Sequence, residues 1–74
     1  MLTFRVGEVA TQQGLTQRAL AARSGLARST IQRYWHGEWT HGWIYLTTLA
    51  KLCEALNAQP GDLMMFVRQG ENDG

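Results

Sequence analysis

The feature that most restricts the fold of this sequence is a three-residue turn, Gly25-Leu26-Ala27, between two short segments of helical periodicity. The first segment, residues 17–24, follows Thr16, whose hydroxyl suits the N-cap because it can accept from backbone N–H groups of the first turn. It ends at Gly25, which adopts a left-handed C-cap without strain. Because so short a turn makes the next helix, residues 28–35, cross at a steep angle, the sequence predicts a helix-turn-helix.

Three further helices are predicted around this unit. One covers residues 5–13 before Gly14, one covers residues 46–56 before Asn57, and one covers residues 60–67, with proline at its first position. The residues expected to face the core are Val6, Val9, Ala10, Leu20, Ala21, Thr30, Ile31, Tyr34, Leu46, Leu49, Leu52, Cys53, Leu56, Leu63 and Phe66. Since no stretch shows the two-residue alternation of an exposed strand, the expected fold class is all-α.

The chain length allows one domain. Its 74 residues, 45% of them apolar, are about half the usual length per domain. We therefore expect a compact domain over residues 1–67. Residues 68–74, which read RQGENDG, are polar and are expected to form a disordered tail.

Several classes of protein are disfavoured by what the chain lacks. It has no run of about 18 apolar residues and no secretion signal, so membrane spanning and export are not expected. Cys53 has no second cysteine to pair with, and with His36 and His41 it does not form a recognisable metal set. We expect no metal and no cofactor, and we expect no catalysis because so small a helical domain leaves little room for a pocket. The unpaired cysteine favours a reducing, cytoplasmic location.

The net charge of +1 conceals an uneven distribution along the sequence. Residues 1–36 carry five arginines against Glu8 alone, whereas the remainder of the chain is acidic. No aspartate or glutamate occurs in residues 9–37, the stretch that contains the predicted helix-turn-helix. A basic surface without acidic residues indicates a polyanionic partner, and nucleic acid is the class that fits.

The outward arc of the helix over residues 28–35 consists of side chains that form hydrogen bonds. It spans about 140° at the 3.6-residue helical period. Its members are Arg28, Ser29, Gln32, Arg33 and His36. An arginine can bond guanine O6 and N7, Gln32 can bond adenine, and Ser29 can bond a base edge or a phosphate. Because a helix also fits the major groove of B-DNA, this face suits base reading.

The segments GLTQRALAARSGLARSTIQRYWHGE and IYLTTLAKLCEALNAQPGDLMMF resemble the Cro and phage-repressor (XRE) family of helix-turn-helix proteins, and the resemblance covers residues 5–67. It implies a five-helix, lambda-repressor-like domain whose third helix enters the major groove, in a small bacterial or phage regulator. By position, it implies base contacts from Arg28, Ser29 and Arg33, with Gln32 beside them. The phosphate contacts that follow from it are Gln17, Arg18, Thr30, His36, Thr40 and His41.

These observations predict a sequence-specific transcription regulator of double-stranded DNA, a repressor or autoregulator, that binds an inverted repeat as a homodimer near the nucleoid. The loop over residues 37–43, GEWTHGW, leaves an alternative open. Trp39 and Trp43, with Tyr45, would form a dimer or partner interface, and the chain would then be a protein-interaction adaptor or an antitoxin-like subunit. Stacking of single-stranded nucleic acid on the tryptophans is a third interpretation.

Overall fold

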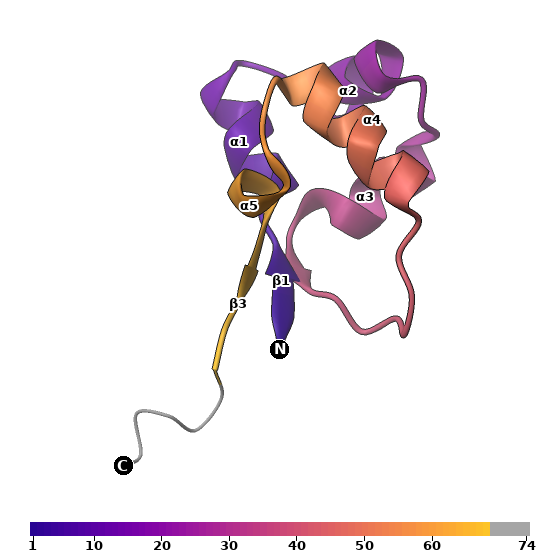
Figure 1. The fold of residues 1–74 in the computed structure, drawn as a ribbon. Coiled ribbons are helices and arrows are strands. Elements are labelled where there is room, and N and C mark those ends of the chain that lie inside the picture. The colour runs from indigo at the N-terminus through magenta and orange to yellow at the C-terminus, as the bar shows by residue number, and fades with distance from the viewer. Residues whose placement is uncertain (69–74) are drawn as a thin grey trace.

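A computed structural model describes residues 1–68 of the chain (Figure 1). Its elements in order are β1 (Leu2–Phe4), α1 (Val6–Gln12), α2 (Gln17–Ser24), α3 (Arg28–Trp35), β2 (Gly37–Glu38), α4 (Leu46–Leu56), α5 (Pro60–Leu63) and β3 (Met64–Phe66). None of these helices is long and apolar enough to span a membrane. Apart from Arg68, the expected disordered tail lies outside the described residues.

The helix-turn-helix has the predicted bounds because its start and stop signals are local. The Thr16 hydroxyl accepts a hydrogen bond from the backbone N–H of Ala19 at 3.1 Å, which caps α2. Gly25 ends that helix in the left-handed conformation, with φ of 77°. The α4 bounds are also as predicted, and Asn57 takes the left-handed cap with φ of 51°.

The domain is mostly helical, but the all-α prediction is wrong because three short strands form an antiparallel sheet in the order β2-β1-β3. The predicted helix over residues 60–67 stops at Leu63, and the chain continues as β3 beside β1. The backbones of Met1 and Val67 exchange two hydrogen bonds of 2.7 Å each, which extends this pairing past the end of β3. Strands of two or three residues are too short to show an alternating pattern, so periodicity missed all three.

Two residues predicted to face the core are exposed. Phe66 is 64% exposed because β3 carries it away from the helical body, as Figure 1 shows. Leu46 is 75% exposed because it is the first residue of α4 and lies at the end of that helix's apolar stripe. Both belong to the surface, where they are available to a partner.

The core is built by side chains from β1 and from every helix. Its buried members are Phe4, Val6, Ala10, Leu20, Ile31, Tyr34, Leu52, Leu56 and Leu63. Leu20 is the only fully buried side chain of α2, whereas α3 contributes two, Ile31 and Tyr34. The buried face of α3 is therefore fixed by a compact apolar cluster, which leaves the opposite face of that helix free for contacts.

Gly7 allows α1 to approach the end of α3 closely. A Cβ atom at this position would lie 2.5 Å from Cε2 and 2.7 Å from Cδ1 of the Trp35 indole. We expect Gly7→Ala to lower the free energy of unfolding by about 1–2 kcal/mol, because overpacking outweighs the better helix propensity of alanine. Urea unfolding monitored by circular dichroism measures this change.

The matched control for Gly7→Ala is Gly61→Ala in α5, where no atom lies within 4 Å of the added Cβ. We expect the control to leave stability unchanged or slightly raised. Equal stabilities for the two variants would contradict the role of the contact between α1 and Trp35.

Candidate nucleic-acid interface

The four side chains predicted to read bases are all exposed on α3. Arg28, Ser29, Gln32 and Arg33 point away from the core that holds the other face of the helix. Within residues 1–68, neither arginine forms an ion pair or a side-chain hydrogen bond. Their guanidinium groups therefore remain available to bind an external acceptor, such as a base edge or a phosphate oxygen.

The predicted phosphate-contacting residues divide into two groups by exposure. Arg18, His36, Thr40 and His41 are exposed on α2 and in the segment after α3. Gln17 and Thr30 are half-buried, because Gln17 begins α2 and Thr30 borders the buried face of α3. The exposed members precede and follow α3 in the sequence, an order that suits contacts with phosphates on both sides of a groove.

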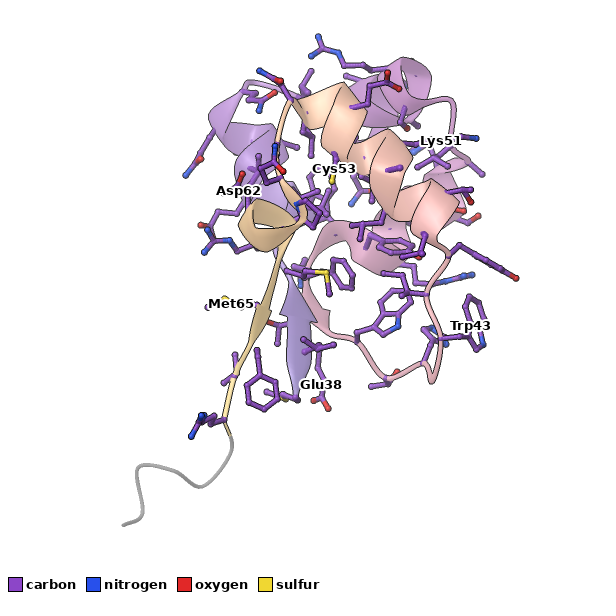
Figure 2. The ribbon with its side chains drawn as sticks, in the orientation of Figure 1. Glu38, Trp43, Lys51, Cys53, Asp62 and Met65 are labelled. Atoms are coloured by element: carbon purple, nitrogen blue, oxygen red, sulfur yellow. The ribbon has the colours of Figure 1, made fainter. Side chains whose placement is uncertain are left out.

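The arginine-rich elements carry no acidic side chain. Arg18 and Arg23 lie on α2, and Arg28 and Arg33 lie on α3. The exposed acidic residues of the described chain lie on other elements, with Glu8 on α1, Glu38 on β2, Glu54 on α4 and Asp62 on α5. Figure 2 shows Asp62 and Glu38 well separated from each other. The helix-turn-helix is thus the basic part of the described fold.

Tyr34 joins the buried side of α3 to two other parts of the structure. Its ring lies edge-on to Phe4 of β1 at 5.0 Å and is tilted against Trp39 at 4.5 Å between centroids. Burial raises the pKa of Tyr34, and a backbone hydrogen bond from Tyr45, just before α4, opposes that shift. Sequence periodicity placed Tyr34 in the core, but no local signal indicated that it ties α3 to β1 and to the start of α4.

The segment between α3 and α4 carries a continuous series of ring contacts. Successive centroid distances are 4.8 Å from Trp39 to His41, 5.6 Å from His41 to Trp43 and 4.8 Å from Trp43 to Tyr45. The Trp39 indole N–H also donates to the Trp43 carbonyl oxygen at 3.0 Å. The series begins at Trp39, which packs against the core, and ends at Tyr45 on the surface. These ring contacts therefore hold in place a segment that has no helical hydrogen bonds of its own.

The three residues predicted as an interface have different roles in this series. Trp39 is half-buried and packs against the core, so most of its ring is part of the fold. Trp43 and Tyr45 are 51% and 61% exposed, and Figure 2 shows Trp43 at the outer side of the loop. The exposed aromatic patch, here defined as Trp43, Tyr45 and Leu46, is what remains accessible to a partner.

Cys53 is the single cysteine of the chain. Cys53 is half-buried on α4, and burial raises the pKa of its thiol, which lowers its reactivity. Among residues 1–68, no three His, Cys, Asp or Glu side chains are placed to hold one metal ion.

The family model described as the Cro/C1-type HTH DNA-binding domain matches residues 5–69, which include the helix-turn-helix and the exposed face of α3. The chain belongs to this family. The resemblance seen in the sequence motifs is thereby confirmed, and the Cro/C1-type assignment extends across α1 to β3.

A solved structure is similar to this Cro/C1-type domain. It is described as the crystal structure of "a putative DNA-binding protein from Bacteroides fragilis". The two chains are 29% identical with a TM-score of 0.67, and the similarity covers 88% of this chain and 100% of the other. The search of curated proteins finds no match. Family and fold together establish a helix-turn-helix DNA-binding domain.

Proposed function

We propose that this Cro/C1-type domain is a sequence-specific regulator of transcription that reads the major groove of double-stranded DNA with α3. The observation that carries the proposal is the face of α3 itself. It presents Arg28, Ser29, Gln32 and Arg33, without ion pairs within residues 1–68, on a helix whose other side is fixed in the core. Recognition of base edges requires hydrogen-bonding side chains that extend from a fixed helix and are not already paired within the protein.

Each side chain of this face has a proposed role. Arg28 and Arg33 bind guanine O6 and N7, Gln32 bridges adenine N6 and N7, and Ser29 bonds a base edge or a nearby phosphate. The phosphate contacts that set the position of the domain are proposed for Gln17, Arg18, Thr30, His36, Thr40 and His41.

The proposed regulator binds an inverted repeat as a homodimer and acts as a repressor or autoregulator at the prokaryotic or phage nucleoid. A single small module buries limited DNA surface, so two copies on two half-sites are the usual route to useful affinity. The two recognition helices would then enter major grooves about one helical turn apart.

Selection of bound duplexes from a random library, at two salt concentrations, tests this function. We expect enrichment of an inverted repeat, with half-sites about one helical turn apart, that persists at the higher salt concentration. Binding that weakens steeply with salt and enriches no motif would be purely electrostatic, and it would contradict sequence-specific regulation.

Arg33→Ala is expected to weaken binding to the selected duplex by about 1–3 kcal/mol and to relax one base position, because a bidentate contact to guanine is lost. Binding constants for the selected and a scrambled duplex, measured by fluorescence anisotropy, check this. Arg23→Ala removes the same charge from α2 and is the matched control, with a small loss expected on both duplexes. An equal loss on the two duplexes for Arg33→Ala would mean that Arg33 contacts only phosphate.

A second function is favoured by one specific observation, the exposed aromatic patch. Trp43 and Tyr45 lie in the loop that ring contacts hold in place, and Leu46 is the first residue of α4; each is more than half exposed. We propose that this patch binds a partner protein, as in an adaptor or antitoxin-like subunit. Trp43→Ala is then expected to abolish co-purification with a co-expressed neighbouring gene product while leaving affinity for the selected duplex unchanged.

A further inference from the structure

His41 occupies the middle of a short loop whose two ends are joined by a hydrogen bond. The Trp39 indole N–H donates to the Trp43 carbonyl oxygen at 3.0 Å, which closes the loop over residues 39–43. The His41 ring contacts both indoles, with centroid distances of 4.8 Å to Trp39 and 5.6 Å to Trp43. The imidazole is therefore exposed to solvent and yet held against two aromatic rings.

A proton on His41 changes the strength of these two contacts. Both centroid distances lie within the range of about 6 Å over which an aromatic ring attracts a cation, and tryptophan is the strongest partner. Trp39 is itself fixed, because its ring packs against Phe4 and Tyr34. The neutral imidazole lacks this attraction, whereas the imidazolium has it from both indoles. The closed loop is therefore more stable when His41 carries a proton.

The other charged and titratable groups around the loop leave the two indoles as the close partners of His41. Those groups are Arg33, Tyr34 and His36 of α3 and its end, Glu38 of β2, Tyr45 before α4 and Lys51 of α4. Within residues 1–68, no carboxylate forms an ion pair with His41, and Figure 2 shows Glu38 apart from Trp43. Arg33 and Lys51 oppose a proton on His41 and Glu38 favours one, but all three side chains are exposed and water screens them.

The loop lies next to the proposed DNA-reading helix. It begins shortly after α3, and Thr40 and His41 are both exposed on it. Burial raises the pKa of Tyr34, while the backbone hydrogen bond from Tyr45 and the charge of Arg33 both lower it. The chain therefore returns, after the loop, to the part of α3 next to Arg33. A phosphate near this helix is within the reach expected of the proposed contact from His41.

The protonation state of an imidazole also decides how well it binds a phosphate. The neutral ring has one N–H donor and no charge, whereas the imidazolium has two N–H donors and a positive charge. Hydrogen bonds between a cation and a phosphate oxygen are about twice as strong as neutral ones. Both the loop contacts and the phosphate contact therefore favour the same protonated form of His41.

We propose that His41 makes DNA binding by this domain sensitive to pH, because its proton both strengthens the closed loop and supplies a positive charge to a DNA phosphate. The inference rests on the proposed function, since it assigns a regulation to the same DNA-binding surface. Affinity is greatest where the imidazole is protonated. It is lost as the pH rises through the range in which histidine releases its proton, about pH 6–7.

Nuclear magnetic resonance of the full chain without DNA, between about pH 5 and pH 8, tests the loop. We expect the indole N–H signals of Trp39 and Trp43 to move with the imidazole signals of His41. Trp35 is the internal control, because in the described part of the chain its ring contacts no histidine. In His41→Gln, which keeps a polar side chain but does not titrate, the Trp39 and Trp43 signals are expected to stay constant.

Fluorescence anisotropy with the selected duplex, at about pH 6 and pH 8, tests the effect on binding. We expect the wild type to bind about threefold to tenfold more tightly at the lower pH. The slope of log affinity against log salt is expected to steepen by about 0.9, because one more phosphate is neutralised. His41→Gln is expected to remove both effects of its imidazole. His36→Gln is the matched control, since His36 is exposed without a ring contact, and it is expected to keep them.

Three results would overturn the inference. They are indole signals of Trp39 and Trp43 that ignore pH, an equal pH dependence of DNA affinity in the wild type and His41→Gln, and a pH dependence that is lost in His36→Gln instead. In each case a duplex motif that is still enriched leaves the proposed function standing. If no motif is enriched at either pH, the proposed function fails, even where the indole signals follow His41.

Discussion

Replacing Tyr34 by alanine is expected to lower the free energy of unfolding by about 3–5 kcal/mol, the range for removal of a large buried aromatic side chain. Tyr34 is 2% exposed and contacts the rings of Phe4 and Trp39. Loss of its side chain therefore leaves a cavity between α3, β1 and the segment that joins α3 to α4. It also removes the group that hydrogen-bonds the backbone of Tyr45. Urea unfolding monitored by circular dichroism measures the effect.

Tyr34→Phe is the matched control because it keeps the ring and removes only the hydroxyl. We expect a loss of about 1 kcal/mol, the usual value for one hydrogen bond. If Tyr34→Ala were as stable as Tyr34→Phe, the ring contacts to Phe4 and Trp39 would contribute little, and the proposed support of α3 from behind would be wrong.

Leu20→Ala is expected to cost about 2–5 kcal/mol, the range for leucine truncation in a core. Leu20 is fully buried and is the only such side chain on α2, so no other residue of that helix compensates for the cavity. Thermal unfolding provides the measurement, with a drop in Tm expected. Leu20→Met, which nearly conserves the volume, is expected to cost less than about 1.5 kcal/mol.

The Leu20 and Arg33 variants separate stability from recognition. Leu20→Ala is expected to reduce binding to the selected and scrambled duplexes in the same proportion, because it lowers the folded fraction. Arg33→Ala is expected to keep the wild-type Tm and to lose affinity for the selected duplex only. A Leu20→Ala protein that is fully folded at the assay temperature yet loses only specific binding would show that α2 has a recognition role of its own.

The helix-turn-helix was predictable because its determinants are close together in the sequence. Thr16 caps α2 through Ala19, three residues away, and Gly25 ends that helix with its own backbone conformation. The buried and exposed faces of α3 follow from the helical period alone. The exposure of the residues proposed to read bases was therefore predictable as well.

The features that the sequence did not predict depend on contacts between distant segments. The pairing of β1 with β3 brings Leu2 beside Phe66, and neither strand alone shows a pattern. Gly7 looks like an ordinary helical glycine until Trp35 is placed against it. The sequence predicts Trp39 and Trp43 on one interface, whereas Trp39 packs inward because Phe4 of β1 lies beside it.

The hydrogen bonds between Met1 and Val67 also set the order in which the molecule can fold. They join residues 66 positions apart, whereas the bonds that define α2, α3 and α4 span a few residues each. Closing so long a loop is entropically costly and becomes favourable only once the helices have shortened the distance. We therefore expect the helices to form first and the pairing of β1 with β3 last, because β1 is synthesised first and β3 is the last of the three strands to follow.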